Sequence, residues 1–325
     1  IRARTKSRGL GDVYKRQALS GKDVLSSADT TAEQTAALLE LASQLKSGDR
    51  RIDLGNRVLG LIFTKASTRT RVSFQVAMAR LGGQTVDLNP QVTQLGRGEP
   101  LEDTARVLSR FCDVLAVRTF AQQELADYAY WASIPVINAL TDLEHPCQAL
   151  ADFLTMQEAF GELQGQTLTY VGDGNNVAHS LMLCGALLGV NVRIACPDGF
   201  EPLPGVLDQA RSLAVGGAEI SVSSDPAAAV AGAQALYTDV WASMGQEQEQ
   251  LERQQAFQGF CLNEELLAKA DSRAIVLHCL PAHRGEEISA EVMECSASRI
   301  FDQAENRLHA QQALLAALLL SLIHI

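Results

Sequence analysis

A cluster of hydroxyl and guanidinium side chains, Ser67 to Arg71, is the part of the sequence best suited to binding an anion. It follows a continuous apolar run of strand length, Val58 to Phe63, and precedes a stretch without Gly or Pro, Val72 to Leu81, that predicts a helix. Ser or Thr at such a helix start directs backbone N–H groups and the helix dipole toward one point. Arg69 and Arg71 add positive charge, and a guanidinium fork matches phosphate. The segment predicts a phosphate site, although an ordinary capped helix with two solvated arginines also fits it.

Two polar side chains, His145 and Gln148, flank Pro146 and Cys147 where a loop becomes a helix. Pro is favoured in a first helical turn, and His and Gln can both bind a carbonyl or amide group. A lone histidine is often a structural residue, so a substrate contact and a structural role both remain open. Cys147 fits a small apolar filler better than a nucleophile.

A glycine-containing turn, Gly172 to Asn176, follows a predicted strand and precedes a predicted helix, as in dinucleotide-binding proteins. Asp198 lies near the end of the next strand, where an acid that binds ribose would be. The third glycine of that pattern is missing, because Val177 and Ala178 occupy its neighbourhood. Two asparagines in the turn suit a substrate's carboxylate or amine better. A nicotinamide site remains the alternative.

Reactive side chains also follow two later predicted strands. Asp239 is a natural partner for an ammonium group. Cys279 leaves a buried strand beside His278 and near Arg284, which could lower the pKa of its thiol; an ordinary buried cysteine is the alternative. The spacing from Cys279 to His283 resembles half of a zinc site, but no second Cys/His pair lies close in sequence, so we expect no metal.

Composition limits the classes of protein that fit. The chain has 325 residues, is 47% hydrophobic and carries a net charge of −11, which disfavours nucleic acid as a partner. Seven cysteines without a C-x-x-C pair are typical of a reducing cytoplasm. The longest apolar run, Ala313 to Ile323, is too short to span a bilayer, so we expect no membrane association. We expect the basic residues 1–17 to be a disordered or extraneous extension.

Strands alternate with helices in two successive sets, which predicts two domains, each with a parallel sheet flanked by helices. We expect residues 18–155, completed by a C-terminal helix at 305–325, to form the first domain and residues 156–304 to form the second. Ligands of parallel sheets bind at the carboxyl ends of the strands. The polar residues above all follow predicted strands, so we expect an active site in a cleft between the domains. The predicted strands are Val58–Phe63, Gln84–Leu88, Val114–Val117, Pro135–Asn138, Thr167–Val171, Asn191–Cys196, Glu219–Val222, Ala235–Tyr237 and Ala274–Leu277.

From about Ala18 to Leu320 the chain resembles an ornithine carbamoyltransferase, in the superfamily that also contains aspartate carbamoyltransferase. Ser67 to Arg71 and His145 to Gln148 resemble the carbamoyl-phosphate motifs of that superfamily. The ornithine branch is indicated by Asp239 with Ser243-Met244-Gly245 and by His278-Cys279-Leu280-Pro281. The resemblance implies transfer of a carbamoyl group from carbamoyl phosphate to the δ-amine of L-ornithine, giving L-citrulline and phosphate in arginine biosynthesis, without a cofactor.

The resemblance also implies roles for individual residues. The catalytic residues would be Arg69, His145, Asp239 and Cys279. Carbamoyl phosphate would contact Ser67, Thr68, Arg69, Thr70, Gln94, Arg118, His145, Gln148, Cys279, Leu280 and Arg307. Ornithine would contact Asn176, Asp239, Ser243 and Met244. The family forms trimers in which a loop, here Pro90 to Pro100, reaches a neighbouring subunit's site, so a homotrimer or a multiple of trimers is expected.

Donors such as Arg69 and His145 would stabilise the charge that forms on the carbonyl oxygen when the amine attacks. Cys279 with Asp239 would be the route for the amine proton. Three alternatives remain: carbamoyl transfer to a related amine, a nicotinamide-dependent oxidoreductase, and a catalytically inactive relative that serves as a scaffold. The intact set of catalytic residues named above disfavours the last of these.

Overall fold

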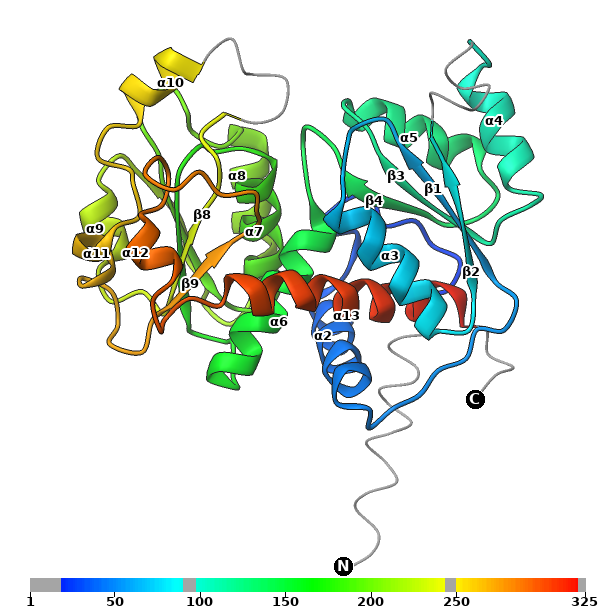
Figure 1. Ribbon diagram of the computed structural model, residues 1–325, viewed down its shortest axis with the longest axis horizontal. Helices are drawn as coiled ribbons and strands as arrows, with labels where there is room; N and C mark the ends of the chain where they lie inside the picture. The colour runs from blue at the N-terminus through cyan, green and yellow to red at the C-terminus, as the bar shows by residue number, and fades with distance from the viewer. Residues whose placement is uncertain (1–18, 90–97, 243–249, 321–325) are drawn as a thin grey trace, which may run out of the picture. The chain divides into compact units, whose positions relative to one another are not determined.

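The computed structural model describes residues 19–89, 98–242 and 250–320, which form two compact units (Figure 1). Unit 1 contains the chain up to Leu150 and again from Arg307, and unit 2 is Ala151–Asn306. The chain passes from one unit to the other within two helices, α6 (Pro146–Phe160) and α13 (Ile300–Leu319). Each unit contains one sheet of parallel strands with helices packed on it, so the predicted fold class is confirmed.

Unit 1 is built on a four-stranded sheet in the order β2-β1-β3-β4. Both central strands are buried almost throughout, because helices cover both faces of the sheet. On one face of the sheet, Ile62 and Leu115 belong to the same core cluster as Leu125 and Tyr128 of α5 (Gln122–Trp131). The strands are β1 (Val58–Phe63), β2 (Gln84–Leu88), β3 (Val114–Arg118) and β4 (Val136–Leu140), and the further helical segments are η1 (Ser27–Asp29), α2 (Ala32–Ser47), α3 (Arg69–Arg80), α4 (Leu101–Leu108) and α5 (Gln122–Trp131).

Unit 2 is built on a five-stranded parallel sheet in the order β7-β6-β5-β8-β9. In Figure 1 the sheet lies between α7 and α8 on one side and α9, α11 and α12 on the other. An aromatic cluster of Trp241, Phe257 and Phe260 belongs to the core on the second side. The strands are β5 (Thr167–Val171), β6 (Asn191–Ala195), β7 (Ile220–Ser223), β8 (Ala235–Thr238) and β9 (Ile275–His278), and the helices are α7 (Asn176–Leu187), α8 (Pro204–Leu213), α9 (Pro226–Val230), α10 (Gln250–Ala256), α11 (Glu264–Leu267) and α12 (Ala290–Met293).

The predicted strands agree with the observed ones to within one or two residues at each end. Two helix starts differ. The helix expected from Val72 begins at Arg69, so the arginine motif lies inside its first turn. The helix expected from Glu305 begins at Ile300, because nothing between Arg299 and Glu305 breaks a helix and Ile300 is itself buried. This second shift brings Gln303 onto the helix.

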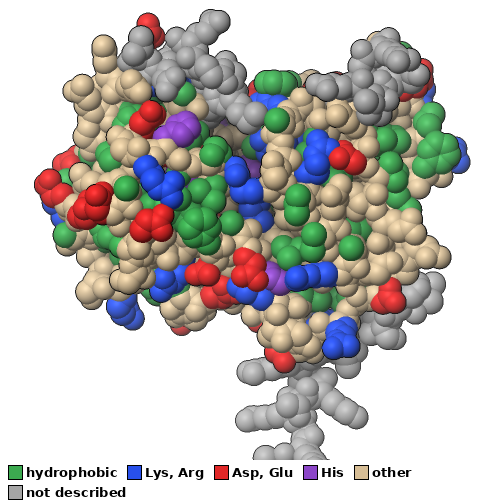
Figure 2. Space-filling model, in the orientation of Figure 1, with side chains coloured by type: hydrophobic (Ala, Val, Ile, Leu, Met, Phe, Trp, Pro, Cys, Tyr) green, Lys and Arg blue, Asp and Glu red, His purple; other side chains and the backbone are tan. Residues whose placement is uncertain are grey.

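On the face drawn in Figure 2, acidic and basic side chains are interspersed over the surface of unit 2. Within the part of the chain that the structure describes, no helix combines the length and the hydrophobicity that a bilayer crossing requires.

Candidate active site

In unit 1 the candidate phosphate residues lie at the point where the strand order reverses. The chain moves outward from β1 to β2 and then returns to β3 and β4 on the other side of β1. Ligands of open parallel sheets bind at such a switch point, outside the carboxyl ends of the strands. Ser67 to Thr70 follow β1, and Arg118 ends β3 directly opposite Phe63 of β1. The turn is fixed to β3 because the Thr64 N–H donates to the Arg118 carbonyl at 2.9 Å.

The first turn of α3 is not an ordinary capped helix start. Thr68 occupies the N-cap position with helical backbone angles, and its side chain accepts no capping hydrogen bond from the helix. The first N–H groups of a helix have no partner within the helix, and a bound anion can satisfy them. Thr68 and Arg69 are exposed, whereas Thr70 is buried. This geometry favours the anion-site interpretation over the alternative of a capped helix with solvated arginines.

Unit 1 also contains a set of buried cationic and polar candidate side chains, one of which contacts Thr70. Arg307 of α13 donates to the Thr70 hydroxyl at 2.5 Å, although 237 residues separate them. Arg118, His145 and Gln148 are each at least nine-tenths buried. Burial, followed by the positive charges of Arg307 and Arg118, holds the pKa of His145 well below its usual value of 6.5. His145 is therefore neutral at physiological pH, so that one ring nitrogen carries a proton and the other can accept a hydrogen bond.

Arg71 does not contribute the positive charge that the sequence predicted for it. Its guanidinium forms a hydrogen-bonded ion pair with Asp87 on β2 and lies over the Phe63 ring. Sequence reasoning had instead passed over Lys65, in the turn after β1. Burial and the nearby charge of Arg118 lower the pKa of Lys65, and its ammonium lies 3.8 Å from the centre of the Phe120 ring. Its position in the turn before Ser67 to Thr70 is the sequence signal that could have identified Lys65 as a further positive charge near the predicted phosphate site.

Cys147 is the apolar filler that the sequence suggested. Its thiol donates to the Asn138 carbonyl at 3.4 Å, and burial raises the pKa of Cys147 to about 12. A thiol with so high a pKa is not a nucleophile near neutral pH.

Glu144, directly before His145, fixes the loop in front of α6 to the N-terminal segment of unit 1. Its carboxylate accepts hydrogen bonds from the Ser26 hydroxyl and the Ser27 N–H.

The candidate residues of unit 2 lie at the corresponding switch point of the second sheet, between β5 and β8. The turn from Gly172 to Asn176 follows β5, and Asp239 follows β8. Gly174 is required by packing, because a Cβ there would lie 2.3 Å from the backbone nitrogen of Pro202. The chain itself thus occupies the space beside this glycine, which disfavours the alternative of a dinucleotide held by the turn.

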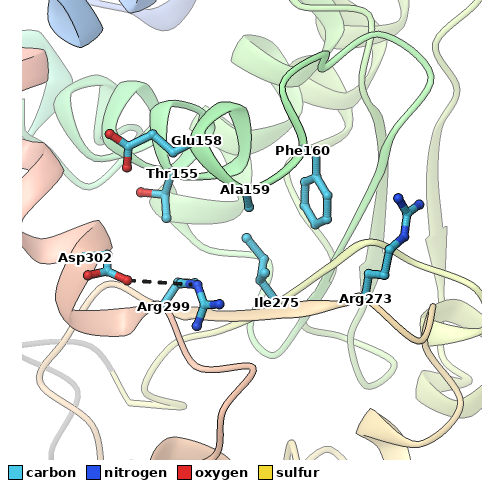
Figure 3. Close-up of a pocket in the computed structure, with 8 residues that line it drawn as sticks. All are labelled: Thr155, Glu158, Ala159, Phe160, Arg273, Ile275, Arg299 and Asp302. Atoms are coloured by element: carbon cyan, nitrogen blue, oxygen red, sulfur yellow. Dashed lines mark ion pairs between the residues drawn. The ribbon is translucent and has the colours of Figure 1, made fainter. Parts of the chain in front are cut away.

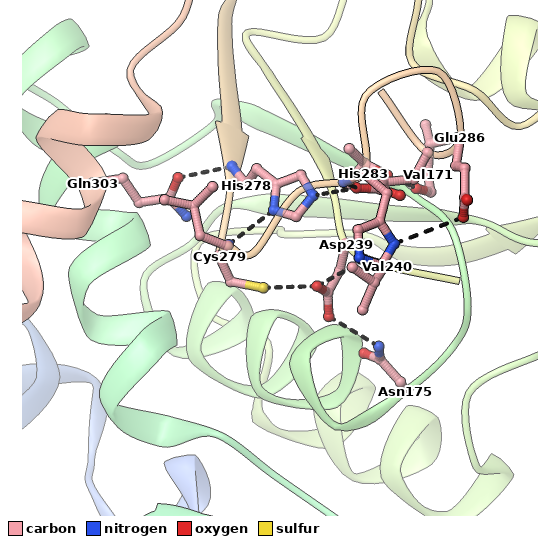
Figure 4. Close-up of polar contacts among 12 residues, drawn as sticks. Val171, Asn175, Asp239, Val240, His278, Cys279, His283, Glu286 and Gln303 are labelled. Carbon is pink, nitrogen blue, oxygen red and sulfur yellow. Dashed lines mark hydrogen bonds and ion pairs between the residues drawn. The ribbon is translucent and has the colours of Figure 1, made fainter. Parts of the chain in front are cut away.

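Asp239 is the centre of a hydrogen-bonded group (Figure 4). One carboxylate oxygen accepts the Cys279 thiol at 2.9 Å and the Val240 N–H at 2.8 Å. The other accepts the Asn175 side-chain amide at 3.2 Å. Asn175 in turn caps α7 by accepting the Val177 N–H at 2.9 Å. Sequence reasoning proposed both asparagines of this turn as substrate contacts, and the resemblance assigned ornithine to Asn176 alone; the capping role of Asn175 was not predicted, although an asparagine directly before a helix is a recognisable capping signal.

Cys279 is held by its neighbours on both sides. The His278 N–H donates to the Gln303 side chain at 2.8 Å, and the Leu280 N–H donates to His278 Nδ1 at 2.9 Å. Because Nδ1 accepts, the ring N–H lies on Nε2, which donates to Glu287 at 3.0 Å. Leu280 has a positive φ of 60°, unusual for a bulky side chain, and its bond to Pro281 is cis. Neither Gln303 nor Glu287 was selected from the sequence.

A buried ion pair fixes the turn from Gly172 to Asn176 in unit 2. Arg253 of α10 donates to the Asp173 carboxylate and to the Trp241 carbonyl, both at 2.7 Å. Asp173 belongs to the turn that carries Asn175, and Trp241 lies two residues after Asp239. Arg253 therefore joins the two segments that form the candidate site in this unit.

A further cluster of side chains able to bind a metal, formed by His283, Glu286 and Glu287, lies on the segment after Cys279, and the group of Asp239, His278 and Cys279 also has suitable spacing. In the second group the Cys279 thiol already donates to Asp239, and His278 Nδ1 already accepts the Leu280 N–H. Three predicted residues, Gln94, Ser243 and Met244, lie outside the described residues.

Comparison with known proteins identifies the class of protein that this fold and these residues define. The model of the carbamoyl-phosphate-binding domain of aspartate/ornithine carbamoyltransferases matches residues 22–158, and that of the Asp/Orn-binding domain matches residues 164–318. The chain belongs to the aspartate/ornithine carbamoyltransferase family.

Relatives within this family narrow the assignment. The chain is 84% identical over 301 residues to the ornithine carbamoyltransferase of Prochlorococcus marinus (strain MIT 9313), covering 93% of this chain and 95% of that protein. It is 63% identical to the ornithine carbamoyltransferase of Nostoc sp. (strain PCC 7120), covering 93% and 98%.

Among solved structures, ornithine carbamoyltransferase from Gloeobacter violaceus has a TM-score of 0.85 at 55% identity, covering 92% of this chain and 99% of that chain. The enzyme from Pyrococcus furiosus has a TM-score of 0.89 at 48% identity, covering 93% and 98%. The resemblance to ornithine carbamoyltransferases that the motifs indicated is confirmed.

Proposed function

We propose that this protein transfers the carbamoyl group of carbamoyl phosphate to the δ-amine of L-ornithine, giving L-citrulline and phosphate, as a cytoplasmic step of arginine biosynthesis. The observation that supports this proposal is that several of the described candidate residues, Ser67 to Thr70 and Arg118 in unit 1 and Asn176 and Asp239 in unit 2, follow or end the strands on either side of their sheet's switch point. The residues of unit 1 are cationic or neutral donors, suited to a phosphate. Those of unit 2 include Asp239, suited to an α-ammonium group.

In unit 1, Ser67, Thr68 and Thr70 would bind the phosphate together with the first N–H groups of α3, while Arg69, Arg118 and Arg307 supply positive charge. Neutral His145 and Gln148 would orient the carbamoyl oxygen. Negative charge forms on that oxygen as the amine attacks, and preorganised donors stabilise it. The C–N bond then forms, the C–O bond to phosphate breaks, and phosphate leaves with the bonding electron pair.

In unit 2, Asp239 and Asn176 would bind the amino-acid end of ornithine, with Ser243 and Met244 as further contacts. The attacking amine must lose a proton. The thiol of Cys279 donates to Asp239 at 2.9 Å, so Cys279 can pass its proton to the carboxylate as it receives one from the amine. The backbone of Leu280 would contact the carbamoyl group. No cofactor takes part in this scheme.

An assay of product formation tests the proposed function. The purified protein is incubated with carbamoyl phosphate and one of four amines: ornithine, putrescine, aspartate or N-acetylornithine. We expect citrulline from ornithine and at least a hundredfold lower rate with the others, because only ornithine offers both a free α-amino acid end and a δ-amine. Faster turnover of putrescine or N-acetylornithine would assign the protein to a related amine. Absence of transfer to all four, with carbamoyl phosphate still bound, would assign it to an inactive relative.

The family's trimeric assembly is also proposed for this chain, with Gln94 of one subunit contacting carbamoyl phosphate in the next. Arg69→Ala and Gln94→Ala variants, each largely inactive, are unfolded and reassembled as an equal mixture. A site is intact only when its own subunit keeps Arg69 and its neighbour keeps Gln94, so about a quarter of wild-type activity should return. A mixture as inactive as its parents, when wild-type protein reassembles normally, contradicts the shared site.

A further inference from the structure

The two ends of β9 are held in different ways. At the amino end, Ile275 lines a cavity of about 460 Å³ (Figure 3). At the carboxyl end, His278 is buried, and both nitrogens of its ring are hydrogen-bonded within unit 2, Nδ1 to the Leu280 N–H and Nε2 to Glu287. The segment that leaves the strand toward the candidate site therefore begins at a fixed side chain.

Glu287 is a carboxylate with 0% of its surface exposed. Burial of a charged group costs free energy unless hydrogen bonds compensate for the lost water. One of its oxygens, Oε1, accepts two N–H groups, that of the His278 ring at 3.0 Å and that of the His283 backbone at 2.5 Å. This single oxygen therefore ties together the two ends of the segment from His278 to His283.

The backbone around Glu287 is itself anchored in unit 2. Its carbonyl accepts the Leu262 N–H at 2.8 Å, and the carbonyl of the next residue, Ile288, accepts the Gly285 N–H at 2.8 Å. The Ile288 side chain is fully buried in a core cluster of this unit. The carboxylate of Glu287 thus has a rigid support, and a side chain with a rigid support can fix the groups that bind to it.

Leu280 depends on this support because its backbone conformation is unfavourable. Its φ of 60° lies in the left-handed region, which bulky side chains avoid. The hydrogen bond from its N–H to His278 Nδ1, at 2.9 Å, holds it there. Directly before Leu280, the Cys279 thiol donates to Asp239 at 2.9 Å. A shift of the His278 ring would therefore move the backbone that carries both Cys279 and Leu280.

We propose that Glu287 is a positioning residue for carbamoyl transfer, which anchors the His278 ring and thereby holds Cys279 and Leu280 in the geometry of the reaction. This role rests on the proposed function, in which the Leu280 backbone contacts the carbamoyl group and Cys279 receives the amine proton. Glu287 acts through His278 and not on a substrate. Because both N–H groups bind the same oxygen of Glu287, the role requires an acceptor at that position rather than a full negative charge.

Three variants of the full-length protein separate the acceptor from the charge. Glu287→Gln keeps an oxygen at the Oε1 position, and its amide nitrogen replaces Oε2, which accepts no hydrogen bond from the described residues. Glu287→Met has a similar length and offers no acceptor. Glu286→Met is the matched control, because the adjacent Glu286 is paired with the exposed ring of His283.

Steady-state kinetics test the effect on turnover, with urea denaturation to establish that each variant is folded in the assay. Glu287→Met should lower kcat about tenfold to a hundredfold, the range expected for loss of a hydrogen bond to a charged group. Glu287→Gln and Glu286→Met should stay within about threefold of wild type. The KM for ornithine should change less than about threefold, since Val240 and Asn175 also hold Asp239. A wild-type kcat in Glu287→Met, or a loss of more than about tenfold in folded Glu287→Gln, overturns the proposal.

Hydrogen exchange and ring spectra test the route through His278 without requiring turnover. The Leu280 amide should exchange at least about tenfold faster in Glu287→Met than in wild type, while the amides of β9 keep their rates, because a general loss of stability would speed both. In wild type, 15N spectra of the His278 ring should place the proton on Nε2.

Unchanged exchange at Leu280, an equal increase in β9, or a wild-type proton on Nδ1 overturns the proposal. The wild-type spectrum and Glu287→Gln keep the test decisive should Glu287→Met not fold. Absence of citrulline with the wild-type protein would contradict the proposed function alone, since neither the exchange nor the spectra depend on it.

Discussion

The two candidate half-sites use the same position on the same kind of sheet but carry opposite charge. In unit 1 the buried candidate residues include Arg118, Arg307 and His145, a histidine that burial and these arginines keep neutral. In unit 2 the residues around Asp239 are a carboxylate, a thiol and an amide. Parallel sheets supply the position through their strand ends, whereas the side chains that follow the strands decide which charge is bound.

The two half-sites also differ in how they are supported. In unit 1, Thr70 is hydrogen-bonded by Arg307 of α13, the last helix of the described chain. Asp239 is supported mainly by neighbours within unit 2, including the ion pair of Arg253 and Asp173 behind the turn. Replacing a site side chain of unit 1 should therefore lower the rate of carbamoyl transfer. Replacing one of unit 2 should weaken ornithine binding or lower the stability of the turn from Gly172 to Asn176.

The largest effect is expected for Arg69→Ala. Its charge would act on the phosphate and the developing oxyanion, so kcat should fall about 10³- to 10⁴-fold, or roughly 4–5.5 kcal/mol, with the fold intact. Arg71→Ala is the matched control, because Arg71 is paired with Asp87. Steady-state kinetics and circular dichroism measure both. Retention of more than about a tenth of the activity by Arg69→Ala would contradict its role in the cationic half-site.

The next effect concerns stability rather than turnover. Arg253→Met leaves the buried Asp173 carboxylate without its ion-pair partner, which should lower the free energy of unfolding by about 3–5 kcal/mol. Adding Asp173→Asn removes the stranded charge and should restore part of this loss. Urea denaturation measures both variants. If the single variant were as stable as wild type, the support proposed for the unit 2 turn would be wrong.

A smaller and more selective effect is expected for Asp239→Asn. The change removes the anionic partner of the α-ammonium group, so the KM for ornithine should rise about tenfold to a hundredfold, while the Kd for carbamoyl phosphate changes little. Initial-rate kinetics and binding of carbamoyl phosphate alone separate the two ligands. An equal loss of affinity for both would show that Asp239 is structural, and the contrast between the half-sites would fail.

The smallest effect is a pH dependence of stability due to His145. Its folded-state pKa is lowered, so below pH 6.5 the unfolded chain binds a proton that the folded protein does not. Stability should therefore decrease as the pH falls below 6.5, by at most about 1.4 kcal/mol per pH unit from this group. His145→Gln should show a shallower decrease when urea unfolding is compared at pH 7.5, 6.5 and 5.5. A steeper decrease in the variant would mean that His145 is protonated in the folded protein.

The sequence by itself determined the positions of the strands, the fold class and the family. Val58 to Phe63 and Thr167 to Val171 were located to the residue because each is a short run made mainly of strand-forming residues that ends at a turn. The polar segments after the strands could be placed at the carboxyl edges because parallel strands share one direction. The specific motifs then indicated an ornithine carbamoyltransferase.

Only the tertiary structure decided which of the candidate side chains meet. Arg71 and Arg69 are indistinguishable in sequence, yet Arg71 is paired with Asp87 of a neighbouring strand. Arg307 and Thr70 lie 237 residues apart and still form a hydrogen bond. Gln303 could not be linked to His278 before the early start of α13 was known. Periodicity reports the local conformation of a segment, whereas these contacts depend on how distant segments pack, which no local pattern encodes.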